Sequence, residues 1–311
     1  MNRRAFLANA TGVVAIPAFA RATGLESVRG DSVIRAPLGG SEVVITTTDR
    51  LAGAIHSVRW GGKEFIDSAD HGRQLQSASN FDCDGEFHPE TFNPTEAGSR
   101  RDGAGPTSSS RLMAIEAAGA ELATTTNMAF WLVPGEESGG HPACNRAILS
   151  DHLLTKRVRI APEEAPGAIR YEVTFRVPEG RRHTYAQFEA LTGYMPPGFG
   201  RFWAFDREAR RFVPLDDGPG EQPRPVAFST EDGGHAMGIY APPRQPTPGC
   251  DGPGYGRFRF LAERVVKWNA VFRRRDPDGI APGDYRFLQY VAIGTLEDVR
   301  RTLTALDGAG R

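Results

Sequence analysis

Two-residue alternation of apolar and polar positions predicts a chain built from β-strands. The clearest case is residues 169–177, whose odd positions are apolar and whose even positions are polar, as in a strand that buries one face. A turn follows at Pro178-Glu179-Gly180. The same reasoning predicts strands at residues 42–48, 52–60, 153–160, 183–191, 200–206, 225–230, 235–241, 256–263, 265–273 and 284–293.

Glycine and proline clusters separate most of these segments, which predicts antiparallel sheets in a sandwich. The 36 Gly and 23 Pro among 311 residues indicate many turns. Residues 67–111 and 242–256 lack periodicity and are interpreted as long loops. With no domain boundary after residue 30, a single domain is expected from residue 30 to 311.

One helix is predicted, at residues 295–306 near the C-terminus. Thr295 is suited to cap it, and its apolar positions recur at helical spacing: Leu296, Val299, Leu303 and Leu306. Such an apolar stripe is typical of a helix that lies against a sheet, so we expect it to close one end of the sandwich.

Residues 1–20 predict a twin-arginine signal peptide. Arg3 and Arg4 precede Phe6-Leu7, and Ala18-Phe19-Ala20 gives the small-x-small pattern of a cleavage site. The alternative is an amphipathic first helix of the domain. The apolar run is far shorter than the roughly 20 residues that a spanning helix needs, so no stable membrane anchor is expected. We therefore expect export to the periplasm or beyond.

Net charge, absent motifs and cysteine content limit the classes of function that this protein can have. The formal net charge is −1 and no basic-aromatic patch occurs, so nucleic acid is not an expected partner. Motifs for nucleotide cofactors and serine nucleophiles are absent, and no cofactor is expected. Cys83, Cys144 and Cys250 permit one disulfide in an exported protein, with any of three pairings, or three free thiols. The oligomeric state is not readable from the sequence.

The most informative polar pattern lies in the predicted strand 183–191. One face of this strand carries only hydrogen-bonding side chains, without Lys or Arg: His183, Tyr185, Gln187 and Glu189. Such a face lines a groove, or it is solvated or structurally paired. In the groove interpretation, Tyr185 and Glu189 bind the ligand.

Other candidates lie on the predicted loops. His71 and Arg73 flank Gly72, where the backbone can turn sharply. Glu96 lies on a rigid loop suited to acid–base work, and Glu221 lies in an acidic turn. Both positions have structural alternatives, a helical turn for Glu96 and a solvated connection for Glu221.

Two further groups of residues have side chains suited to ligand contacts. The run Asn80, Asp82, Asp84, Glu86 and His88 does not match a calcium or zinc spacing, so no metal site is predicted. Trp203 and Trp268 are candidates for stacking on a sugar, with a core position as the alternative.

The order of these features resembles the galactose-mutarotase-like β-supersandwich proteins, which include aldose epimerases, polysaccharide lyases and domains of glycoside hydrolases. The resemblance rests on residues 52–58 with Gly62-Lys63-Glu64, on Gly72-Arg73, on the strand 169–177 leading to His183-Thr184-Tyr185, and on residues 281–285. It implies an all-β antiparallel supersandwich with few short helices. It also implies His183 as the proton donor, with Glu221 or Glu263 as the late base.

Together these observations predict an exported carbohydrate-active protein, an enzyme that acts on a sugar or glycan by acid–base chemistry as a hydrolase, lyase or epimerase. Its catalytic residues would be His183 with Glu96 or Glu221. One cleft is expected to gather His183, Glu189, Arg73, His71 and Glu96, with Trp203 or Trp268 at its wall. A non-catalytic carbohydrate-binding protein and a structural envelope protein are the alternatives.

Overall fold

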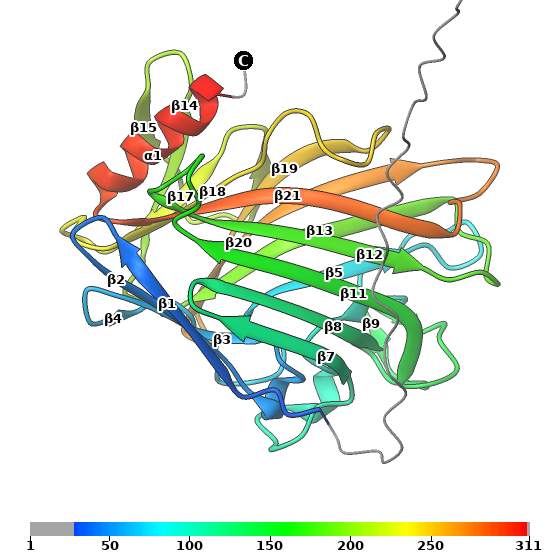
Figure 1. Ribbon diagram of the computed structural model, residues 1–311. Helices are drawn as coiled ribbons and strands as arrows, with labels where there is room; N and C mark the ends of the chain where they lie inside the picture. The colour runs from blue at the N-terminus through cyan, green and yellow to red at the C-terminus, as the bar shows by residue number, and fades with distance from the viewer. Residues whose placement is uncertain (1–27, 310–311) are drawn as a thin grey trace, which may run out of the picture.

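The alternating segments form two antiparallel layers of strands (Figure 1). The computed structural model describes residues 28–309, so the predicted signal peptide lies outside the described residues. In hydrogen-bonded order, the first layer contains β1 (Ser32–Leu38), β2 (Ser41–Thr47), β3 (Ile55–Trp60), β5 (Leu75–Phe81), β13 (Tyr185–Met195), β20 (Val265–Arg275), β19 (Asp251–Phe260) and β16 (Gly220–Gln222).

The second layer is built from the remaining long strands. In order these are β7 (Arg111–Ala118), β8 (Glu121–Phe130), β11 (Leu149–Ile160), β12 (Ala168–Val177), β21 (Gly283–Gly294), β18 (Ala236–Tyr240), β17 (Val226–Ser229), β14 (Arg201–Asp206) and β15 (Arg211–Pro214). The short strand β6 (Pro94–Thr95) pairs with both β5 and β8 and so joins the layers. The predicted all-β antiparallel sandwich is confirmed.

Short elements complete the connections. They are β4 (Lys63–Glu64), the hairpin of β9 (Glu137–Ser138) and β10 (His141–Pro142), and the 3-10 turns Asp49–Leu51 and Arg100–Asp102. Among the described residues, no helix is long and apolar enough to cross a membrane.

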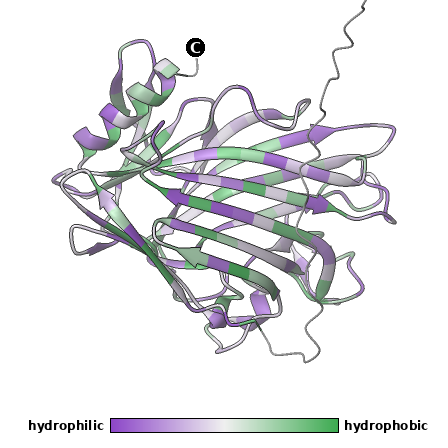
Figure 2. Cartoon of the chain, viewed as in Figure 1, coloured by the Kyte–Doolittle hydropathy of each residue, from purple (hydrophilic) through white to green (hydrophobic). Residues whose placement is uncertain are grey.

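Aromatic side chains from both layers fill the space between them. Phe188 of β13 lies 5.2 Å from Phe175 of β12 and 5.3 Å from Phe287 of β21, measured between ring centroids. Phe272 of β20 stacks on Phe287 at 4.6 Å. Because side chains alternate along a strand, the same strands turn their other residues outward, as the alternating colours along the strands of Figure 2 illustrate.

The predicted C-terminal helix is present as α1 (Leu296–Ala309), which packs on β18 and β21. Thr295 caps it, because its hydroxyl accepts from the Asp298 amide at 3.1 Å while Asp298 accepts from the Thr295 amide at 3.0 Å. Val299 and Leu303 are fully buried on the inner face. The amphipathic pattern therefore identified both the helix and its packed side.

The prediction of long loops at 67–111 and 242–256 was wrong in part. Residues 75–81 form β5, and β19 begins at Asp251. In β5 the polar residues are Gln76, Ser77, Ser79 and Asn80, and all four are buried. Apolar alternation is therefore missing, because interior hydrogen bonds take the place of apolar contacts for part of this strand.

A buried ion pair ties the second layer to the segment after β6. Lys156 of β11 donates to one carboxylate oxygen of Glu96, and both side chains are 0% exposed. The other oxygen of Glu96 accepts from the Ser77 amide at 3.1 Å, and the Lys156 ammonium also lies 3.4 Å from the Gly53 carbonyl. Glu96, predicted for the cleft, thus lies in the core.

Removing one partner of this pair should be severe. We expect Lys156→Met to lower the free energy of unfolding by about 3–5 kcal/mol, because it leaves the Glu96 carboxylate buried without a counter-charge. The double variant Lys156→Met with Glu96→Gln should regain most of that loss. Urea unfolding of the three proteins measures both effects, and a single variant as stable as the parent would contradict this account.

Candidate functional site

The outward face of β5, β13 and β20 carries a cleft whose layout depends on a bulge in β13. The pairing register shifts between Glu189 and Leu191, so Glu189 and Thr192 share one face although they are three residues apart. Leu191 consequently turns into the core. Gly193 allows this path, because a Cβ there would lie 2.4 Å from the Trp268 ring.

Strand pairing arranges the polar side chains in rows across the cleft. Thr192 is flanked by Gln76 on β5 and Asn269 on β20. Gln187 is flanked in the same way by Asn80 and Arg273. The cleft has a volume of about 380 Å³, and these six side chains are among its lining residues.

An ion pair occupies the middle of this surface. Lys267 lies 3.2 Å from Glu189, which also accepts from the Thr192 hydroxyl at 2.8 Å. Burial alone would raise the pKa of Glu189, but the charge of Lys267 and hydrogen bonds from Thr192, Lys267 and Asn269 outweigh burial, so the pKa is lowered. Burial would lower the pKa of Lys267, but Glu189 and Tyr194 outweigh it, so that pKa is raised.

A second ion pair lies beside the first. Arg273 donates through both terminal nitrogens to the two oxygens of Glu221, at 2.7 Å each, and through Nε to Gln187 at 3.2 Å. The hydrogen bond to Glu221 is the main cause that raises the pKa of Arg273. Glu221 therefore reaches the cleft through β16, but both of its oxygens are already engaged.

One wall holds an aromatic ring and a polar atom without a partner. Trp131 packs against Gly72, where a Cβ would lie 2.7 Å from the indole ring. Gln76 donates to the Gly72 carbonyl at 2.9 Å, while its own side-chain oxygen is buried and accepts no hydrogen bond within residues 28–309. A buried acceptor left open on a cleft wall is a position for a ligand donor.

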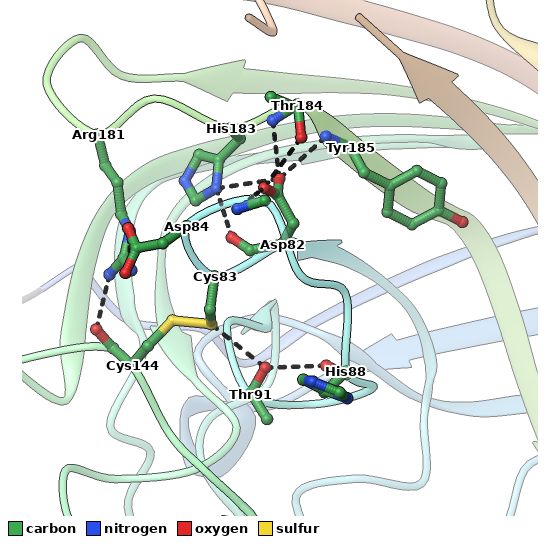
Figure 3. Close-up of polar contacts among 11 residues, drawn as sticks. Asp82, Cys83, Asp84, His88, Thr91, Cys144, Arg181, His183, Thr184 and Tyr185 are labelled. Atoms are coloured by element: carbon green, nitrogen blue, oxygen red, sulfur yellow. Dashed lines mark hydrogen bonds and ion pairs between the residues drawn. A yellow bond between two sulfur atoms is a disulfide. The ribbon is translucent and has the colours of Figure 1, made fainter. Parts of the chain in front are cut away.

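His183 lies outside this cleft, so the predicted strand face was wrong at its first position. Asp82 accepts from the amides of Thr184 and Tyr185, at 2.9 Å each, and this turns the chain just before β13 begins (Figure 3). The His183 ring lies between Phe81 and Phe92, with centroid distances of 4.8 Å to each. It lines a different cleft, described below.

His71 and Arg73 are engaged in other contacts. The His71 side chain is buried, and its ring nitrogens lie 2.7 Å from the Gly103 carbonyl and 2.8 Å from the Arg50 carbonyl. Arg73 forms an ion pair with Asp70 at 2.9 Å. Both side chains hold loop backbone, and the expected convergence with Glu189 does not occur.

Neither predicted tryptophan forms the wall of the cleft. Trp268 is 0% exposed and directs its indole N–H at the Met195 sulfur, 3.3 Å away. Trp203 donates to the Ser229 hydroxyl at 2.9 Å and packs against the hydrophobic cluster that includes α1. Tyr185, predicted to bind the ligand, is buried and is not among the lining residues, although its hydroxyl lies 3.5 Å from the side-chain oxygen of Gln187, which is.

The cleft contains residues that the sequence analysis did not select. On β20 the signal was present, because Lys267, Asn269 and Arg273 alternate with core residues in the predicted strand 265–273. Gln76 gave no such signal, since β5 was interpreted as loop. Trp131 lies outside any strand.

Comparison with known proteins adds information on the fold. No protein-family model and no curated protein matches the chain. A protein in the glycosyl hydrolase family 38 from Enterococcus faecalis superposes with a TM-score of 0.51 at 11% identity, over 93% of this chain and 34% of its own. The chain has the galactose-mutarotase-like fold.

Two further solved structures are similar over most of their length. A putative aldose 1-epimerase from Klebsiella pneumoniae has a TM-score of 0.43 at 11% identity, over 91% of this chain and 93% of its own. The Slr1438 protein from Synechocystis has a TM-score of 0.45 at 11% identity, over 88% and 100%. At such identity a likeness concerns the fold and leaves the reaction open.

The lowered pKa of Glu189 makes a prediction about stability and pH. Its ionised form is stabilised by Lys267, so the resulting stability is complete above the ordinary value of 4.5 and is lost as the pH falls through the lowered value. The difference in melting temperature between the parent and Glu189→Gln should therefore shrink in acid. Thermal melts of both proteins from neutral pH to below pH 4.5 measure it, and a constant difference would contradict the ion pair.

Proposed function

We propose that this is an exported carbohydrate-active protein that binds a neutral saccharide in the cleft on the outward face of β5, β13 and β20. The observation that carries the proposal is the open side-chain oxygen of Gln76, buried beside Trp131. A sugar offers hydroxyl donors for the oxygen and an apolar ring face for the indole. Few other ligands combine hydroxyl donors and an apolar face within one ring.

The charges in the cleft support a neutral ligand. Lys267 is paired with Glu189, and Arg273 with Glu221, so each positive charge has a negative partner. Such pairs present fixed donors and acceptors, and the one further carboxylate of the lining, Glu90, accepts from the Ser138 hydroxyl at 2.9 Å. Asn80, Asn269 and Gln187 add neutral amide groups around them.

Acid–base catalysis is the second candidate, favoured by the presence of Glu189 and Glu221 in one cleft. A hydrolase needs a carboxylic acid with a raised pKa, and a general base works best with a pKa near neutrality. Here the pKa of Glu189 is lowered and that of Lys267 is raised, the reverse of what proton transfer needs. The electrostatics therefore favour binding over turnover by this pair.

Export to an oxidising compartment agrees with the cysteine chemistry. Cys83 and Cys144 form a disulfide, and Cys250 is the free cysteine of the described chain. Structural disulfides persist outside the reducing cytoplasm. This bond supports export from the cytoplasm, and the adjacent Arg3 and Arg4 support the twin-arginine route.

Saccharide binding is tested at Trp131 and Gln76. Titration calorimetry against glucose, galactose, mannose, maltose and cellobiose should show binding that Trp131→Ala weakens about tenfold. The control Trp131→Phe keeps a ring and should retain most of the affinity, and Gln76→Leu should weaken binding by a few-fold.

Two outcomes of this experiment would change the conclusion. Heats that are unaffected by Trp131→Ala would contradict binding at this cleft. Turnover of a glycan that Glu221→Gln abolishes would replace the binding proposal with the enzymatic one.

Export is tested separately by changing Arg3 and Arg4 together to Lys. Because the twin-arginine receptor reads both guanidinium groups, the uncleaved precursor should accumulate in the cytoplasm. Cell fractionation and immunoblotting measure the distribution. Unchanged export of the double variant would refute this route.

A further inference from the structure

A second and larger cleft opens at the end of the sandwich, between the two layers. Its volume is about 710 Å³, and it lies where β8, β11 and β12 end or begin next to the segment that precedes β13. Phe92 and Phe130 give it apolar surface, and His152, His183 and Asn145 give it polar atoms. The function proposed above uses none of these residues.

The first acceptor in this cleft is His183. Its Nδ1 lies 2.8 Å from the Asp82 carbonyl oxygen, so Nδ1 carries the proton and donates it. Burial is the main cause that lowers the pKa of His183, ahead of the opposing contacts with Asp82. The ring is therefore neutral near pH 7, and Nε2 presents a lone pair with no partner within residues 28–309.

The second acceptor is His152, whose side chain is buried. Burial, followed by the charge of His183, lowers the pKa of His152 to about 3. The ring packs beside Phe81 at a centroid distance of 5.0 Å, and its nitrogens form no hydrogen bond with the described residues. A neutral imidazole always has one nitrogen with a lone pair, so it accepts a hydrogen bond.

The third acceptor is the side-chain oxygen of Asn145. Its amide nitrogen donates to the Ala147 carbonyl at 2.8 Å and to the Leu132 carbonyl at 3.1 Å, which fixes the orientation of the group. The oxygen is then left buried with no donor in the described part of the chain. Asn145 itself is 7% exposed, so bulk water has little access to it.

We propose that this cleft is a second binding site for a neutral, hydroxyl-bearing ligand, with hydroxyls donating to Asn145, His152 and His183 and an apolar face on Phe92 and Phe130. Three acceptors without donors disfavour an anion in the buried part of the cleft. The buried carboxylate, Asp82, is engaged with backbone amides, and the exposed Asp84 pairs with Arg181 at 3.2 Å, so the buried part offers no free carboxylate to a cation. The other charged lining residues, Arg146, Asp151 and Glu179, are exposed at the mouth. A saccharide terminus has the required chemistry.

The two clefts share a wall formed by residues 83–93. Glu90 and Asn93 line the first cleft, whereas Asp84 and Phe92 line the second. The Cys83–Cys144 disulfide holds this wall in place (Figure 3). The second site is therefore a separate chamber and can be tested independently of the first.

The test follows the histidine ring nitrogens by NMR at fixed pH while glucose, galactose, mannose, maltose and cellobiose are added in turn. At least one sugar should shift His152 and His183 saturably and leave the control His235 unchanged. His152→Phe keeps a flat ring beside Phe81 but removes the acceptor, so it should fold with an unchanged or higher melting temperature. Because one hydrogen bond to the sugar is lost, the sugar concentration that half-saturates the shift of His183 should rise about tenfold.

A matched variant separates the two sites. Gln76→Leu in the first cleft should leave the shifts of His152 and His183 as they are in the parent. The proposal is overturned if no sugar shifts either ring, or if folded His152→Phe shows the parental response at His183. It is also overturned if Gln76→Leu abolishes the response, since the shifts would then report on the first cleft. If Trp131→Ala leaves sugar binding unchanged while His152 and His183 still respond to the sugar, only the function proposed above is refuted.

Discussion

The buried contact between Lys156 and Glu96 is the interaction on which the arrangement of the first cleft depends. Glu96 accepts from the Ser77 amide, and the Ser77 hydroxyl donates at 2.8 Å to the carbonyl of Ala190, the residue at the β13 bulge. Tyr171 of the second layer lies 3.0 Å from the same hydroxyl. A charge pair in the core is thereby linked through one serine to the backbone that places Glu189 and Thr192.

This connection explains why a protein would keep two charges in its interior. A buried ion pair contributes little net stability compared with apolar residues of the same size, but it tolerates few alternative arrangements. A slip of one residue in β5 would turn Gln76 and Asn80 into the core and expose Ser77. Because Ser77 binds Glu96 and Ala190 together, the register in which Gln76 faces the cleft is the one that satisfies these polar groups.

The sequence pattern identified the elements that bury one apolar face and missed those that are held by polar contacts in the interior. Two-residue alternation identified the strand at 169–177, and helical spacing of apolar residues identified the helix with its Thr295 cap, since each element buries one apolar face. Alternation had limits elsewhere. It did not identify β5, whose polar residues are buried, with Ser77 bonded in the core and Gln76 and Asn80 lining the cleft. It also did not identify the bulge, which places Thr192 on the same face as Glu189. Glu189 and Glu221 were predicted and reach the first cleft, but His183, His71 and Glu96 are held by contacts between segments far apart in sequence. No local pattern reports such contacts.

The Cys83–Cys144 bond also bears on where the protein can work. It joins positions 61 residues apart, and the chain between them includes β6, β7 and β8 as well as the wall between the clefts. In a reducing cytoplasm that wall would be held by non-covalent contacts alone, whereas an oxidising environment would fix it covalently. If the chain is exported in a folded state, as proposed above, the disulfide would form only at the destination. Inside the cell, both clefts would then share a wall without its covalent link.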